Sequence, residues 1–177
     1  MATWRPLTLE DIEGLVHVAS VVHPGLPERE CVFAERARLF PEGCLVLVDE
    51  GRVCGYAISH PIRRREPPAL DSLLDEIASG ADQYYIHDVC VLPELRGCGH
   101  ALDVANKLLA VAERYPTTCL VSVYGTARFW ARFGFMAPGD VDQALSDKLR
   151  AYGADAVYLE RRNTSRAHLS PVSSSDS

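Results

Sequence analysis

The sequence predicts a mixed α/β fold built around one sheet. Three observations support this prediction: helical and strand-like segments alternate along the chain, an early pair of apolar runs forms a hairpin pattern, and a strand–glycine loop–helix–strand unit lies at the centre. The length of 177 residues, with 47% apolar and 24% charged residues, fits one globular domain. We therefore expect a domain over residues 1–162 and a Ser-rich, disordered tail over residues 163–177.

Two helices are expected first. Thr8 is a helix-capping residue followed by acidic residues, and apolar residues then recur at helical spacing as far as Val22. His23-Pro24-Gly25 ends this helix. A second helix is expected from Glu28 to Phe40, where Pro41-Glu42-Gly43 breaks the pattern.

A hairpin and a long irregular segment come next. Residues 44–48 and 53–58 are β-rich runs separated by a short turn that contains Gly51. Residues 60–82 contain three prolines, and we expect a loop there with one short helix over residues 70–78.

The second half of the chain contains the central crossover. Its expected elements are a strand at 84–92, a helix at 100–115, a strand at 117–124, helices at 126–133 and 141–152, and a last strand at 156–161.

Charge and cysteine usage exclude several classes of protein. The net charge of −6 argues against nucleic acid as a partner, because phosphate binding leaves a basic footprint. The start of the chain has no pattern of a secretory signal, and its longest early uncharged stretch, residues 14–27, is too short to cross a membrane. The six cysteines form no CxxC pair, so we expect buried thiols in a cytoplasmic protein and no metal.

The loop from Arg96 to Ala101 is a candidate anion site. Its glycines let backbone N–H groups approach an anion, and the following helix adds a favourable dipole. The loop is not a dinucleotide fingerprint, because Leu102 stands where a third glycine is needed, and no Gly-Lys-Ser/Thr follows as in a P-loop.

Two motifs together resemble the GNAT family, the Gcn5-related N-acetyltransferases. Residues 89–101 are similar to its motif A, a strand followed by (Q/R)xxGx(G/A), with Arg96, Gly99 and Ala101 at the defining positions. Residues 129–135 (FWARFGF) are similar to its (F/L)YxxxGF signature. The resemblance covers about residues 3–162 and implies a GNAT-like acyl-CoA N-acyltransferase fold, with a twisted mixed sheet of about six or seven strands flanked by helices.

The resemblance also implies acetyl-CoA as the co-substrate. In this family the motif strand and the next strand splay apart, the pantetheine arm lies between them, and the pyrophosphate sits on the loop. Carried over residue by residue, the cofactor-binding positions are Val89, Cys90, Val91, Arg96, Gly97, Cys98, Gly99, His100 and Ala101.

The catalytic candidates are His87, Asp88 and Tyr124. His87 and Asp88 are adjacent on the motif strand and should point to opposite faces, one as the base and the other as a structural partner of a nearby loop. Trp130 stands where the family usually has a tyrosine that acts as the general acid, and a tryptophan cannot protonate a thiolate. Val123 stands where the family commonly has an asparagine. Tyr124 is then the nearest phenol for the acid role, the alternative being an aromatic side chain that closes the core.

The resemblance implies transfer of an acetyl group from acetyl-CoA to a primary amine, directly in a ternary complex. A small-molecule acceptor is preferred over a protein or peptide, because the compact chain has no accessory domain. The alternative from another class is a non-catalytic acetyl-CoA-binding sensor, which Trp130 and Val123 keep open. A homodimer is a further expectation, since homodimers are common among proteins that resemble this one.

Overall fold

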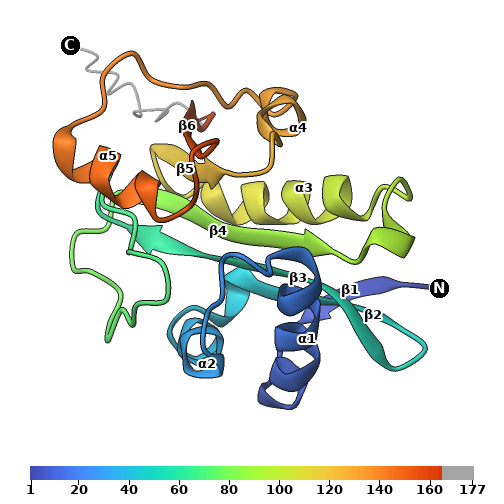
Figure 1. Ribbon diagram of the computed structural model, residues 1–177. Helices are drawn as coiled ribbons and strands as arrows, with labels where there is room; N and C mark the ends of the chain where they lie inside the picture. The colour runs from blue at the N-terminus through green and yellow to red at the C-terminus, as the bar shows by residue number, and fades with distance from the viewer. Residues whose placement is uncertain (165–177) are drawn as a thin grey trace, which may run out of the picture.

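A computed structural model describes residues 1–164, and its centre is one mixed sheet of six strands (Figure 1). The strands are β1 (Thr3–Pro6), β2 (Cys44–Asp49), β3 (Arg52–Ile62), β4 (Gln83–Val91), β5 (Thr117–Ser122) and β6 (Val157–Arg162). They lie side by side in sequence order; β4 and β5 run parallel, and all other neighbours are antiparallel. The predicted mixed α/β architecture is confirmed.

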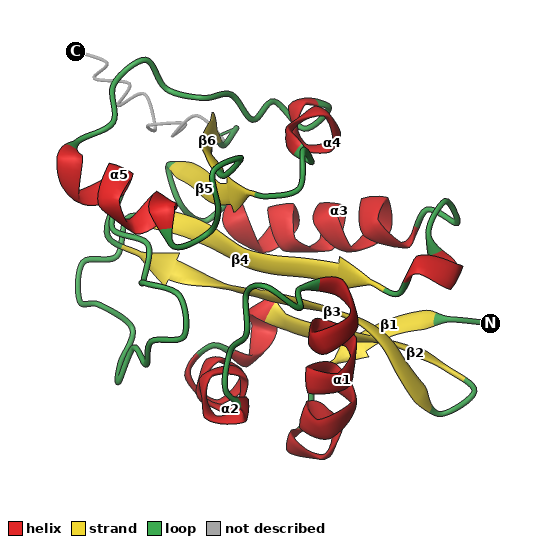
Figure 2. Cartoon of the chain, in the orientation of Figure 1, coloured by secondary structure: helices red, strands yellow, loops and turns green. Residues whose placement is uncertain are grey.

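Helices cover both faces of the sheet (Figure 2). They are α1 (Ile12–Val22), α2 (Glu30–Leu39), α3 (His100–Ala112), α4 (Ala127–Ala131) and α5 (Gln143–Arg150). Apolar side chains of α1 and α2 pack with Val46, Tyr56 and Ile58 on one face. Those of α3 pack with Ala57, Tyr84 and Ile86 on the other. Of the helices in residues 1–164, none has the length and apolar character needed to cross a bilayer.

The N-terminal strand is absent from the sequence-based prediction. Residues 3–6 pair with β2, although their four residues are too few for a recognisable alternation. A short 3₁₀ turn over residues 9–11 then leads into α1. Thr8 and Asp11 form the expected cap, in which the backbone N–H of Thr8 donates to the Asp11 carboxylate at 2.8 Å.

The predicted helix over residues 70–78 is wrong. The backbone N–H groups of Leu74 and Asp75 donate to the carboxylate of Glu35, at 2.6 and 3.0 Å. The fully buried guanidinium of Arg36 donates to the carbonyl of Ser72. The side chains of α2 therefore satisfy backbone groups that a helix would otherwise satisfy internally.

The structured part of the chain extends past residue 162, the predicted end of the domain. Asn163, assigned to the tail from sequence, is only 6% exposed. Its side chain accepts a hydrogen bond from Thr118 and donates to the carbonyls of Ala112 and Tyr115. These bonds fix the end of β6 against α3. The rest of the predicted tail, residues 165–177, lies outside the described residues.

Candidate functional site

Strands β4 and β5 diverge and leave an open strand edge. They pair only from Gln83–Thr117 to Ile86–Leu120, whereas β4 continues to Val91. Residues 87–91 of β4 thus have no register partner on β5. A cavity of about 810 Å³ lies at this divergence, lined by the segment between α1 and α2, by β4, and by the end of β5.

The predicted strand residues for cofactor binding lie on this open edge. Val89, Cys90 and Val91 pair with β3 on one side and border the cavity on the other. The backbone N–H and C=O groups that point away from β3 are therefore free of a β5 partner. An extended ligand with amide groups could pair with this edge in the manner of an added strand.

The predicted anion loop lies directly after this edge. Gly97 and Gly99 have φ of +80° and +83°, a conformation that glycine adopts without strain. Gly99 is the N-cap of α3, so the first N–H groups of that helix have no partner within the helix. The exposed loop residues Arg96, Gly97, Cys98 and Gly99 and the half-buried His100 and Ala101 surround this helix end, whose unpaired N–H groups could bind an anion.

His87 and Asp88 point to the same face, which corrects the prediction that they point to opposite faces. The β3–β4 register runs from Ile58–Asp88 to Ser59–Ile86 and leaves His87 unpaired in a β-bulge. The extra residue cancels one step of the side-chain alternation. Both side chains therefore reach the α1–α2 segment, and both residues line the cavity.

His87 is held by Glu28. Its Nε2 lies 2.7 Å from Oε1 of Glu28, and only 1% of the imidazole is exposed. Nδ1 of His87 is buried and has no hydrogen-bond partner among the described residues. His87 is thus held by Glu28, which lies in the segment between α1 and α2.

Asp88 faces the cavity between two partners. Oδ1 lies 3.0 Å from Nε2 of His23, and Oδ2 accepts a hydrogen bond from the Tyr56 hydroxyl at 2.5 Å. Burial raises the pKa of Asp88, but the charge and hydrogen bond of His23, with the Tyr56 hydroxyl, lower it below its ordinary value. Burial lowers the pKa of His23, and Asp88 more than offsets this, so that the net shift is upward. The pair is thus a partly buried carboxylate beside an imidazole that favours its charged form.

The thiol of Cys90 belongs to the same cluster. Sγ lies 2.9 Å from Nε2 of His23 and 3.3 Å from Oδ1 of Asp88. Burial, with the charge of Asp88 as the next cause, raises the pKa of this thiol well above its ordinary value. In this environment Cys90 is a protonated thiol rather than a nucleophilic thiolate.

Tyr124 borders the cavity at the end of β5. Its ring stacks on that of His23 with centroids 5.4 Å apart, and 53% of the residue is exposed. It has a φ of +55°, an uncommon conformation for a tyrosine. Burial of part of the ring, followed by the charge of Asp88, raises its pKa. Because Tyr124 is exposed, it does not close the core, which was the alternative role for this side chain. Trp130, by contrast, is buried against α3 and also lines the cavity.

Two residues of the site, His23 and Glu28, were not candidates from sequence. His23 served there only as part of a helix stop, and Glu28 only as the start of a helix that in fact begins at Glu30. Both lie 59 or more residues before their partners on β4. The one available signal was their position in the segment between the two helices expected at the start of the chain.

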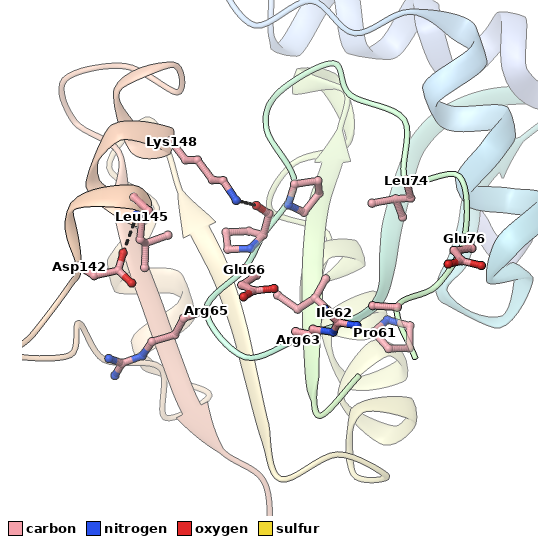
Figure 3. A pocket seen from close by; sticks show the side chains of 14 residues that line it. Pro61, Ile62, Arg63, Arg65, Glu66, Leu74, Glu76, Asp142, Leu145 and Lys148 are labelled. Atoms are coloured by element: carbon pink, nitrogen blue, oxygen red, sulfur yellow. Dashed lines mark hydrogen bonds between the residues drawn. The ribbon is translucent and has the colours of Figure 1, made fainter. Parts of the chain in front are cut away.

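A second, smaller cavity of about 440 Å³ lies between the 61–68 segment and α5 (Figure 3). Figure 3 shows Lys148 pointing to the backbone of the 61–68 segment, where its ammonium donates to the carbonyl of Pro67 at 2.9 Å. The side chains around this cavity carry both signs of charge, and the cluster of imidazoles and carboxylates described above is not part of it.

Comparison with known proteins agrees with this arrangement. The model of the family described as "Acetyltransferase (GNAT) family" matches residues 9–135. No curated protein sequence matches the chain.

Solved structures with the same fold are distant in sequence. The loading GNATL domain of CurA from Lyngbya majuscula has a TM-score of 0.75 at 14% identity, over 92% of this chain and 98% of that one. Ard1 from Thermoplasma volcanium has a TM-score of 0.67 at 17% identity, over 91% and 97%. Arabidopsis thaliana Naa50, solved with the bisubstrate analogue CoA-Ac-MVNAL, has 0.66 at 14%, over 90% and 97%. At these identities the likeness establishes the fold alone.

Proposed function

The chain belongs to the GNAT acetyltransferase family, and we propose that it transfers the acetyl group of acetyl-CoA to a primary amine in a ternary complex. The observation that supports this proposal is the open edge of β4, which joins an anion-binding helix end to a cavity lined by carboxylates. Acetyl-CoA has phosphates, a long arm with amide groups and a thioester, which match the helix end, the open edge of β4 and the cavity in turn.

The cofactor occupies the divergence of β4 and β5 in this proposal. Its pantetheine amides pair with the backbone of Val89, Cys90 and Val91, and its pyrophosphate binds the N–H groups from Gly97 to Ala101. The thioester then lies at the start of the splay, beside Asp88. A backbone N–H on the same open edge stabilises the tetrahedral oxyanion without any rearrangement of solvent.

Asp88 is assigned to the acceptor amine. Its carboxylate has a lowered pKa and 15% of the side chain is exposed, so it is charged where a cationic amine arrives. The bound ammonium first loses a proton to solvent, and the neutral amine then attacks the thioester carbonyl. As the C–N bond forms, the attacking nitrogen becomes strongly acidic, and the Asp88 carboxylate accepts its proton and later passes it to solvent. His87 is assigned to positioning rather than to this contact, because its side chain is closed off by Glu28.

Tyr124 is assigned as the acid that protonates the departing thiolate. Its raised pKa keeps the phenol protonated at neutral pH, and its exposed ring borders the cavity. Breakdown of the tetrahedral intermediate releases the CoA thiolate, which takes the phenolic proton, and solvent restores the tyrosine. Trp130 has no proton that could serve this purpose.

A small amine is the preferred acceptor, because the cavity lies within one chain and has apolar walls from Val22, Leu26 and Phe33. A peptide amine is the second candidate. It is favoured by the likeness to Naa50, whose structure holds a peptide-containing bisubstrate analogue.

The test follows release of free thiol from acetyl-CoA with a panel of diamines, arylalkylamines, amino acids and short peptides. Release that depends on one class of amine is expected and identifies the acceptor. Asp88→Asn should lower kcat/KM by about 10²-fold, while Asp147→Asn, an exposed carboxylate on α5, should leave it unchanged. Tight binding of acetyl-CoA without release from any amine would favour the sensor, and failure to bind acetyl-CoA would refute the proposal.

A further inference from the structure

Three side chains of different chemistry converge on one point beside the cavity. His23 comes from the end of α1, and Asp88 and Cys90 come from alternate positions of β4. The imidazole Nε2, the carboxylate oxygen and the thiol sulfur all lie within 4.8 Å of one another. The distances are 3.0 Å from Nε2 to Oδ1, 2.9 Å from Nε2 to Sγ and 3.3 Å from Sγ to Oδ1.

The arrangement differs from a proton relay. In a relay the imidazole uses one nitrogen for the nucleophile and the other for the carboxylate. In this cluster the same Nε2 faces both Cys90 and Asp88, and Nδ1 is buried without a hydrogen-bond partner within residues 1–164. Three potential donor atoms thus lie together, at the mutual proximity that a metal ion's ligands need.

We propose that His23, Asp88 and Cys90 bind a divalent cation of borderline softness, of which Zn²⁺ is the type. Thiolate, imidazole and carboxylate together are a donor set that suits this ion. This inference goes beyond the proposed transferase function and does not depend on it.

The dimensions of the cluster fit such an ion after a small expansion. Zinc–ligand bonds of about 2.0–2.3 Å in a tetrahedron place ligand atoms about 3.3–3.7 Å apart. The 2.9 Å between Nε2 and Sγ must therefore widen by about 0.6 Å, and the 3.0 Å between Nε2 and Oδ1 by about 0.3 Å. His23 can supply this movement, because it follows the last residue of α1 and its side chain is 11% exposed.

The surroundings provide the other features of a metal site. The Tyr56 hydroxyl donates to the second oxygen of Asp88, which orients the carboxylate from outside the cluster. A dication bound between Asp88 and Cys90 would stabilise the thiolate by its charge. All three residues line the cavity, so a bound cation would be accessible from it.

Binding at this point has a consequence for the cavity. The cation would occupy the space beside Asp88 where the acceptor amine is proposed to bind. This consequence, unlike metal binding itself, rests on the proposed function: the cation would compete with the amine, and its release would expose the carboxylate. The cluster is a candidate control point for availability of the active site.

The experiment uses the full chain, freed of metal with a chelator and titrated with Co²⁺ alone as a spectroscopic substitute for Zn²⁺. We expect one Co²⁺ per chain, intense visible absorption typical of tetrahedral cobalt, and a near-ultraviolet sulfur-to-cobalt charge-transfer band. Addition of Zn²⁺ should abolish both signals. No transferase assay is needed, so the outcome is independent of the proposed function.

Two variants and one matched control locate the site. Cys90→Ser should abolish the charge-transfer band, and His23→Gln should weaken Co²⁺ binding at least tenfold. The variant Cys31→Ser removes an exposed thiol outside the cluster and should retain every signal. A band that persists in Cys90→Ser, or the absence of a band in the unmodified chain, would overturn the proposal. If Cys90→Ser does not fold, as judged by its circular dichroism, the His23→Gln titration decides.

Discussion

Nε2 of His87 lies 2.7 Å from Oε1 of Glu28, and the exposed fractions of the two side chains are 1% and 6%. The contact ties the bulged part of β4 to the segment that precedes α2. It thereby fixes the position of the neighbouring Asp88 relative to the cavity. Loss of one partner leaves the other buried without its hydrogen bond.

Glu28→Ala should therefore lower the free energy of unfolding by about 1–3 kcal/mol, the cost of an unsatisfied buried polar group. Urea denaturation followed by fluorescence measures this value. Glu30→Ala, two residues on and exposed, is the control and should cost less than about 1 kcal/mol. Equal losses in the two variants would show that the Glu28–His87 contact does not stabilise the fold.

Gly99→Ala should weaken acetyl-CoA binding about tenfold, equivalent to 1.4 kcal/mol. The substitution strains the positive φ of the N-cap and tilts the N–H groups proposed to bind the pyrophosphate. Gly80→Ala is a matched control, since Gly80 also has a positive φ and open space around its Cα. Calorimetry with acetyl-CoA should show normal affinity for Gly80→Ala; a normal affinity in Gly99→Ala as well would remove this loop from the proposed cofactor site.

Tyr124→Phe should reduce kcat by about 10²–10⁴-fold, the usual contribution of a general acid, and leave the affinity for acetyl-CoA unchanged. The ring that stacks on His23 is retained, so packing is preserved. Tyr115→Phe removes a phenol on the α3 side of the sheet and serves as the control. Unchanged turnover in Tyr124→Phe would mean that the thiolate leaves without enzymic protonation.

His60 should make the stability depend on pH. Burial, followed by the nearby His87, lowers its pKa from 6.5 to about 3. Between these values the unfolded chain binds the proton that the folded chain rejects, so the free energy of unfolding falls as the pH falls through this window.

The variant His60→Asn removes the titrating group and keeps an N–H donor near Nδ1, which contacts the carbonyl of Pro61. We expect a flatter pH dependence of the urea midpoint between pH 6.5 and about 3. His17→Asn, an exposed imidazole on α1, is the control for loss of any histidine. Superimposable profiles for His60→Asn and the unmodified chain would contradict the prediction.

Local features of the fold and site could be predicted from the sequence. The loop from Arg96 to Ala101 was identifiable because a tight turn and a helix start need glycines at fixed spacing, and these requirements lie within a few residues. The divergence of β4 and β5 followed from the family resemblance. The order of helices and strands after residue 80 followed from periodicity, with ends displaced by a few residues.

Features set by distant contacts could not be predicted in this way. The orientation of His87 depends on a bulge against β3, and one extra residue in the pairing reverses the expected face. His23 lies 65 or more positions before Asp88 and Cys90, so no spacing motif contains the cluster. The failed helix over 70–78 depends on Glu35 and Arg36 of α2, whose side chains hold that segment from outside.

The short pairing between β4 and β5 is a weak backbone connection within the sheet. The backbone pairing between β4 and the antiparallel pair of β5 and β6 is limited to four residue pairs. Side-chain contacts such as those of Arg65 and Gln83 with Glu160 add to it. A ligand that bridges the divergence would act as a removable cross-link between these two parts. Amide hydrogen exchange in β5 and β6 should slow when such a ligand binds, whereas exchange in β2 and β3, which are paired over most of their length, should change little. The divergence of β4 and β5 would then determine that β5 and β6 unfold locally before the rest of the sheet.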